Sequence, residues 1–196
     1  MKVFDETAPG VFEETAETIT LHGLGFLQVK LGGGQRLHVW HPALPRRRCF
    51  QHSSIHDHRF SFESRVIVGT AINHLYGARE ADAGEPPTHI GYLHEGPRTA
   101  FGNRPWLPDL KLVVEKIGAM NVPAGAGYRM LAYRYHATEP GGDGRVATIM
   151  RKTGESMAGA HSLCEAGVTP DADFDRKQWL EDRLWAIVRD VLGGAA

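Results

Sequence analysis

The sequence predicts an all-β protein: a barrel or sandwich of antiparallel strands, followed by one C-terminal helix. The middle of the chain consists of short runs rich in Val, Ile, Leu, Phe and Tyr, separated by Gly, Pro and Asp. Seven or eight such runs at this spacing are typical of a sandwich or barrel. In the last segment the apolar positions recur every three or four residues, which is typical of an amphipathic helix.

Length and composition limit the classes of protein that fit. A chain of 196 residues predicts a single domain over 1–196, with the barrel core at about 24–152. With 42% hydrophobic residues and no apolar run near the ~18 residues of a membrane span, we expect a globular protein outside the membrane. The net charge of -1 argues against a nucleic-acid partner. Because the first residues lack a basic and then apolar segment, we expect a cytoplasmic location.

The expected strands begin with a hairpin formed by residues 25–31 and 35–41 about Gly32, Gly33 and Gly34, since glycines adopt the positive φ of tight turns. Before it, residues 13–17 form a short helix or an irregular arm. The further strands are expected at 54–58, 65–76, 110–117, 119–122, 128–136 and 145–152. Residues 77–108, rich in Pro and Gly, are expected to form a long segment with little regular structure.

The C-terminal helix is expected at about 173–192. Its apolar stripe is formed by Leu180, Leu184, Ile187 and Val191. Aspartates at 171, 173 and 175 lie where they would cap the helix and offset its dipole, and Gly193 provides a stop. We expect the helix to pack on the barrel or on a second subunit, and a homodimer is our expectation for the assembly.

Histidines are the strongest functional signal, with 11 in the chain. In the run Ser54-Ile55-His56-Asp57-His58, an extended backbone places His56 and His58 on one face and Asp57 on the other. Two imidazoles on one face form half of a metal site. Asp57 is left either to orient a ligand or to lie at the surface. Neither cysteine belongs to a CxxC pair, so a thiolate zinc site is not predicted.

A third ligand must come from another strand, and His136 is the candidate. Alternation along 131–136 places Arg134 and His136 on one face of that expected strand. Arg59, Arg134 and Tyr135 are candidates for contacting an anionic substrate, since arginine binds carboxylates through two hydrogen bonds. The remaining histidines that we expect to be solvated or bonded to loops are His22, His38, His41, His89, His94 and His161.

The spacing of these residues resembles the cupin superfamily. Its first motif is matched by His56, His58, Glu63 and Gly69, and its second by Gly118, Pro123, Gly125 and His136. The resemblance implies a double-stranded β-helix, or jelly-roll barrel, with His56, His58 and His136 as metal ligands and Glu63 as a fourth. Two departures are visible: the usual glutamate position falls on Phe62, and His136 follows the turn by eleven residues.

Within that superfamily, the run from Ser53 to His58 resembles the three-histidine thiol dioxygenases of the cysteine dioxygenase type. This likeness implies Fe(II) as the metal, although Zn, Mn and Ni also accept imidazole ligands. The expected function is a mononuclear non-haem Fe(II) dioxygenase acting on a small polar molecule. Two alternatives remain open: a non-catalytic small-molecule or sugar-binding cupin, and a metal-dependent isomerase or lyase.

Overall fold

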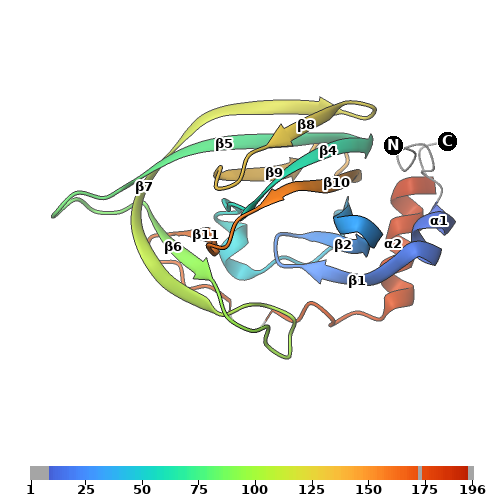
Figure 1. Cartoon of the computed structure of the whole chain (residues 1–196), viewed down its shortest axis with the longest axis horizontal. Helices are drawn as coiled ribbons and strands as arrows, with labels where there is room; N and C mark the ends of the chain where they lie inside the picture. The colour runs from blue at the N-terminus through green and yellow to red at the C-terminus, as the bar shows by residue number, and fades with distance from the viewer. Residues whose placement is uncertain (1–8, 172–173, 194–196) are drawn as a thin grey trace.

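The computed structural model describes residues 9–171 and 174–193, and in this part of the chain the strands form two antiparallel sheets (Figure 1). The first sheet has the order β1 (Ala16–His22), β2 (Phe26–Leu31), β3 (Gln35–Trp40), β10 (Val146–Glu155), β4 (Phe60–Val68) and β8 (Gly127–Met130). The second has the order β11 (Ala160–Glu165), β6 (His89–His94), β7 (Trp106–Pro123), β5 (Thr70–Glu80) and β9 (His136–Pro140). The helices are α1 (Pro9–Thr15) and α2 (Glu181–Gly193), with 3-10 turns at Gly32–Gly34 and Arg48–Gln51. The predicted β-rich fold with a C-terminal helix is confirmed.

One face of the first sheet packs against α2, which lies beside α1 and β1 in Figure 1. The shared core combines odd-numbered residues of β2 and β3 with the apolar stripe of the helix: Leu27, Val29, Leu37, Val39, Leu184, Val188 and Val191. All of these side chains are at most 1% exposed. Because successive strand residues alternate faces, the even-numbered residues point to the opposite side, toward the second sheet.

Truncating the buried helix stripe should cost far more stability than truncating its exposed neighbour. We expect Leu184→Ala to lower the free energy of unfolding by about 3 kcal/mol, because it removes apolar contacts and leaves a cavity. Leu180, which was expected in the apolar stripe, instead precedes the helix and is 82% exposed. Leu180→Ala is therefore the matched control, and we expect a change below about 0.5 kcal/mol. Urea unfolding measures both; equal losses would contradict the described packing of α2.

Several of the predicted strand positions along the chain are confirmed. The hairpin of β2 and β3 turns at Gly32–Gly34, where Gly33 and Gly34 have φ values of 68° and 74°. The N-terminal segment, left open between a helix and an arm, contains α1 and then β1. Expected strand 145–152 corresponds to β10.

The strand expected at 65–76 is wrong, because the chain turns at Gly69 and passes from the first sheet to the second. Gly69 has a φ of 70°, and a Cβ built there would collide with the carbonyl oxygen of Arg145. Only glycine fits this turn without strain. The two strands expected at 110–117 and 119–122 are one long strand, β7, which is paired with β5 and β6.

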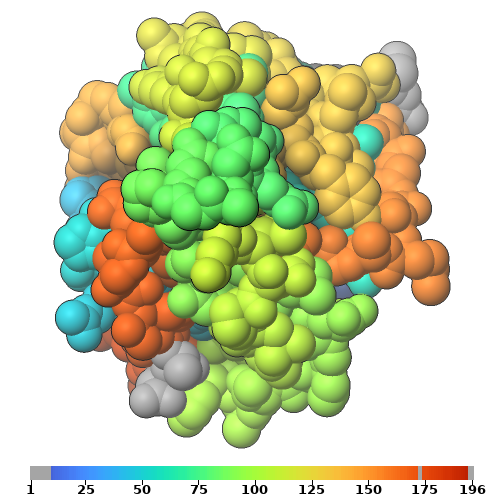
Figure 2. Space-filling model, turned by 90° about the vertical axis from the view of Figure 1, so that its left-hand side faces the viewer, coloured from blue at the N-terminus to red at the C-terminus, as the bar shows by residue number. Residues whose placement is uncertain are grey.

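Residues 77–108 are more regular than expected. β5 continues to Glu80, β6 occupies His89–His94, and β7 begins at Trp106. Only the connections 81–88 and 95–105 lie outside strands. The first of these projects toward the viewer in Figure 2, in green.

Two other expectations at the C-terminal side are corrected. The strand expected at 128–136 ends at Met130, since Tyr133 has a φ of 58° and interrupts the extended backbone before β9. The helix begins at Glu181 rather than near 173, so the aspartates at 171 and 175 do not cap it, and residue 173 lies outside the described residues. Neither α1 nor α2 has the length and apolar character needed to cross a membrane.

Candidate metal centre

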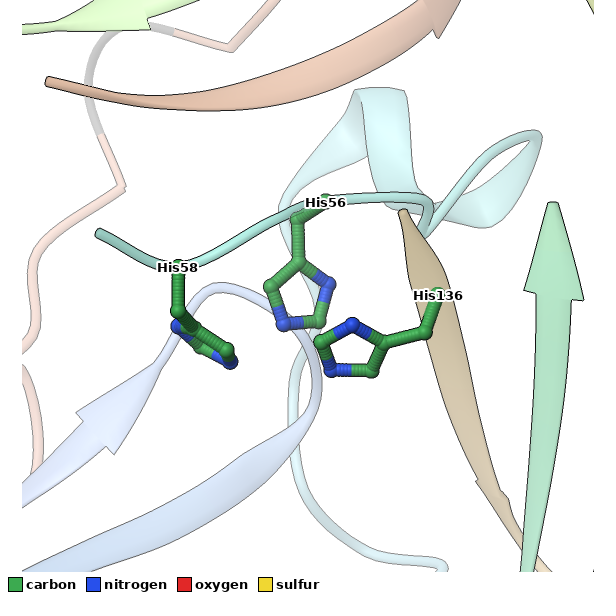
Figure 3. A group of neighbouring side chains, drawn as sticks. All are labelled: His56, His58 and His136. Atoms are coloured by element: carbon green, nitrogen blue, oxygen red, sulfur yellow. The ribbon is translucent and has the colours of Figure 1, made fainter. Parts of the chain in front are cut away.

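Three histidines converge in the space between the two sheets. The possible ligand nitrogens of His56, His58 and His136 all lie within 4.8 Å of one another. Figure 3 shows His56 and His58 projecting from one extended segment and His136 from β9 toward them. The ring centroids are separated by 4.8 Å for His56 and His58, 4.4 Å for His56 and His136, and 5.1 Å for His58 and His136. The structure therefore brings together the three histidines that the sequence predicted as ligands.

Backbone pairing fixes the relative positions of His56 and His136. The amide of each residue donates a hydrogen bond to the carbonyl of the other, both at 2.9 Å. Residues that exchange both hydrogen bonds lie directly opposite each other in an antiparallel ladder, so their side chains share a face. His58 reaches the same face because it is two residues beyond His56 along an extended backbone.

The segment carrying His56 is held on both sides by strands that end the second sheet. On one side it pairs with β9 through His136, and on the other with β11 through Ser162. On the β11 side, the Leu163 amide donates to the Ile55 carbonyl at 2.8 Å and the Asp57 amide to the His161 carbonyl at 3.0 Å. The segment thus covers both sheet edges, which gives the histidines a rigid backbone.

Hydrogen bonds to carbonyl oxygens select one tautomer for two of the rings. The Nδ1–H of His56 donates to the Ser54 carbonyl at 3.0 Å, and that of His136 donates to the Arg134 carbonyl at 2.9 Å. A carbonyl can only accept, so the proton lies on Nδ1 and the Nε2 lone pair is free. Orientation by a backbone carbonyl is a frequent support for metal-binding histidine. The His58 ring instead packs against Phe60 and Phe62, with centroids at 4.8 and 5.4 Å.

Burial keeps the three imidazoles neutral. It lowers the pKa of His136 to about 3, and it also lowers the pKa of His56 and, more strongly, that of His58. The positive charge that one ring would carry further lowers the pKa of its neighbours. A neutral imidazole is the form that binds a metal ion. The donor set, its free Nε2 atoms and its protonation state therefore fit a divalent transition metal.

These rings open into a cavity of about 230 Å³ lined by both sheets. Its wall includes four histidines that we expected to be solvated or bonded to loops: His22, His38, His94 and His161. For His38 the sequence holds a signal of this position. His38 alternates with the apolar Leu37 and Val39 along β3, so its side chain lies on the face opposite to theirs. Burial lowers the pKa of His38 to about 3 and that of His94 to about 4.

Asp57 is buried and anchors β11 beside the centre, rather than lying at the surface. Its carboxylate accepts a hydrogen bond of 2.6 Å from the amide of His161 and lies 3.8 Å from that residue's Nδ1. The Nε2 atom of His161 lies 2.9 Å from Asp109. The carboxylate of Asp57, reinforced by that of Asp109, raises the pKa of His161.

Glu63 does not join the cluster, so its expected role as a fourth ligand is corrected. Its carboxylate oxygens lie 2.8 Å from Arg129 and 3.4 Å from Arg151. Along β4 the even-numbered Phe60 and Phe62 are buried and face the histidines, so the odd-numbered Glu63 points to the other side. The one-residue departure from the cupin motif places phenylalanine where a glutamate would face the site.

The three residues expected to contact substrate are not among the described residues that line the cavity. Arg59 forms an ion pair of 2.8 Å with Glu155 at the surface. Arg134 is exposed, because the turn that precedes β9 breaks the alternation predicted for that strand. Tyr135 packs beside the apolar cluster of Ile55, Leu112 and Leu163, and burial raises its pKa to about 12.

No protein-family model matches the sequence, and no curated protein matches it.

Proposed function

We propose that the protein is a mononuclear metal enzyme, a non-haem Fe(II) dioxygenase that acts on a small polar molecule inside the cavity. The observation that carries the proposal is the convergence of His56, His58 and His136 within 4.8 Å, with neutral rings directed into the cavity between the two sheets. A surface histidine cluster would lack the low pKa values that burial gives these rings. Histidine is also a ligand type suited to iron.

We further propose that the two sheets form a double-stranded β-helix of the cupin type. The support is the pair of antiparallel sheets with a cavity between them, and a first pair of histidines separated from His136 by the five strands β4 to β8. The turn at 123–125 is followed by β8 in the first sheet before the chain returns to the second sheet at β9. This added strand accounts for the eleven residues that separate the turn from His136.

Fe(II) held by three neutral imidazoles would supply a dication with free coordination positions for the activation of dioxygen beside a substrate. The chain contributes a fixed geometry, since the carbonyls of Ser54 and Arg134 hold two of the rings. The aromatic rings of Phe60 and Phe62 pack against His58. No carboxylate of the described residues joins the cluster, so the charge of the metal is not offset there.

Oxygen uptake tests the proposal directly. The protein is loaded with Fe(II) without air and screened in an oxygen electrode against small thiols, diketones, catechols, sugar nucleotides and short acids. We expect at least one substrate to be consumed in step with oxygen, and we expect the His136→Ala variant to lose this activity. Turnover under nitrogen would instead indicate an isomerase or lyase. Ligands that protect against unfolding without any oxygen uptake would indicate a binding protein.

A further inference from the structure

The cavity that holds the three histidines is strongly positive. Five arginines are among the described residues that line it: Arg36, Arg47, Arg98, Arg104 and Arg176. Asp57 is the one acidic residue in the same described lining, and its carboxylate is engaged by the amide of His161. The wall thus has a large excess of positive charge before any metal ion is added.

Most of these guanidinium groups have only neutral partners. Within the described chain, the guanidinium of Arg36 has no hydrogen bond or ion pair, and it lies 5.3 Å from the centre of the Phe60 ring. Arg176 donates from Nε to the Leu21 carbonyl at 3.0 Å, and from Nη2 to Thr20 and Gln28 at 3.2 and 3.3 Å.

The other arginines follow the same pattern with one exception. Arg98 and Arg104 donate to the carbonyls of Gly102 and Gly96, within their own loop. Arg47 differs, because the negative charge of Asp171 acts on it and it packs over Trp106. The uncompensated charge therefore lies with Arg36, Arg98, Arg104 and Arg176. Three of these, Arg36, Arg98 and Arg176, converge from β3, the β6–β7 loop and the segment before α2.

These three charges act on one another. Burial, followed by the charges of Arg98, Arg36 and Arg47, lowers the pKa of Arg176 to about 10. Burial and then Arg98 also lower the pKa of Arg36, while the opposing effect comes from Glu155, which is itself paired with Arg59 and Lys152. Crowded positive groups that lack a counter-charge are stabilised by an anion between them.

This group lies close enough to the histidines to share one ligand. Arg36 and His58 line the same cavity and contact the same ring, because the Arg36 guanidinium lies 5.3 Å and the His58 ring 4.8 Å from the centre of the Phe60 ring. Gln28 joins the two regions, because its Oε1 accepts from Arg176 and its Nε2 lies 3.4 Å from Nε2 of His38. A cavity of about 230 Å³ is below the usual range for drug-sized ligands, so its occupant is small.

We propose that Arg36, Arg98 and Arg176 form an anion subsite that binds a dianionic group of the substrate, while another group of the same molecule reaches the three histidines. Three guanidinium charges exceed the single charge of one carboxylate, so the occupant is a phosphate monoester or a dicarboxylate. That the bound anion is a substrate rests on the proposed function. The anion subsite itself does not depend on a bound metal.

Calorimetric titration of the metal-free protein tests this subsite, with inorganic phosphate and succinate as probes and acetate as the monoanion. We expect saturable binding of phosphate or succinate that is at least about 10-fold tighter than that of acetate. Arg36→Gln and Arg98→Gln should each weaken it by about 10-fold or more, since each removes a charged hydrogen-bond donor. The Arg36 side chain makes no hydrogen bond within the described chain, so its substitution breaks no side-chain hydrogen bond.

Arg151→Gln is the matched control, because Arg151 is a surface arginine on the same sheet. It should leave anion binding unchanged. The His56→Ala/His136→Ala double variant should also keep binding, so that loss of the metal centre and loss of the anion subsite are distinguished. Tighter binding of phosphate than of succinate would indicate a substrate that carries a phosphate group. Tighter binding of succinate would indicate a dicarboxylate. No saturable binding, equal affinity for acetate, or unchanged affinity in both arginine variants would overturn the proposal.

Discussion

Replacing His136 by alanine should lower metal affinity by more than about 100-fold. Loss of a partner that merely orients a ligand costs 10–100-fold, and His136 would supply one of only three nitrogens in the described cluster. We expect the same for His56→Ala. The measurement is metal content after dialysis, together with competition against a chelator of known affinity.

Two controls make this result specific to the cluster. His52→Ala removes an exposed histidine only four positions before His56, and it should leave metal content unchanged. Glu63→Gln should also leave it unchanged, because that carboxylate pairs with Arg129 and Arg151 away from the cluster. Full metal occupancy in a His56→Ala/His136→Ala double variant would show that the metal is bound elsewhere.

The cluster was predictable because its geometry depends on local alternation. His56 and His58 share a face whenever their segment is extended, and that holds although the segment forms only isolated bridges rather than a regular strand. His136 was found for a partly wrong reason, since the expected strand 128–136 is interrupted at Tyr133. His136 nevertheless lies in the cluster, because it begins β9, where its backbone pairs with that of His56.

The arginine-lined wall was not predicted, for a different physical reason. Along β3, alternation puts Leu37 and Val39 on one face and Arg36 and His38 on the other. A polar face of this kind normally lies in water, which is why His38 was expected to be solvated. Only the second sheet, whose pairing with the segment at His56 joins residues distant in the sequence, encloses that face. Because the covering strands are distant in the sequence, nothing in the residues around Arg36 and His38 indicates that this face is covered.

Acidification should destabilise the metal-free protein well before its carboxylates are protonated. Burial lowers the pKa of His38 and His136 to about 3 and that of His94 to about 4, whereas an unfolded histidine titrates near 6.5. Between these values the unfolded chain binds protons that the folded chain cannot. The contribution of these histidines to the free energy of unfolding is therefore constant above about pH 6.5, and it is lost as the pH falls toward 4. Each histidine contributes on the order of 1 kcal/mol per pH unit.

One histidine acts in the opposite direction. Because its carboxylate partners raise the pKa of His161, that residue stabilises the fold below its unfolded pKa, and this contribution is lost as the pH rises through its folded pKa. The buried rings of His38, His94 and His136 outweigh it. We therefore expect the free energy of unfolding, measured in urea at pH 5, 6 and 7, to fall toward pH 5. His38→Gln should reduce the slope of that decline with pH by about one proton. A flat profile between pH 5 and 7, or an identical slope in His38→Gln, would contradict neutral burial of these histidines.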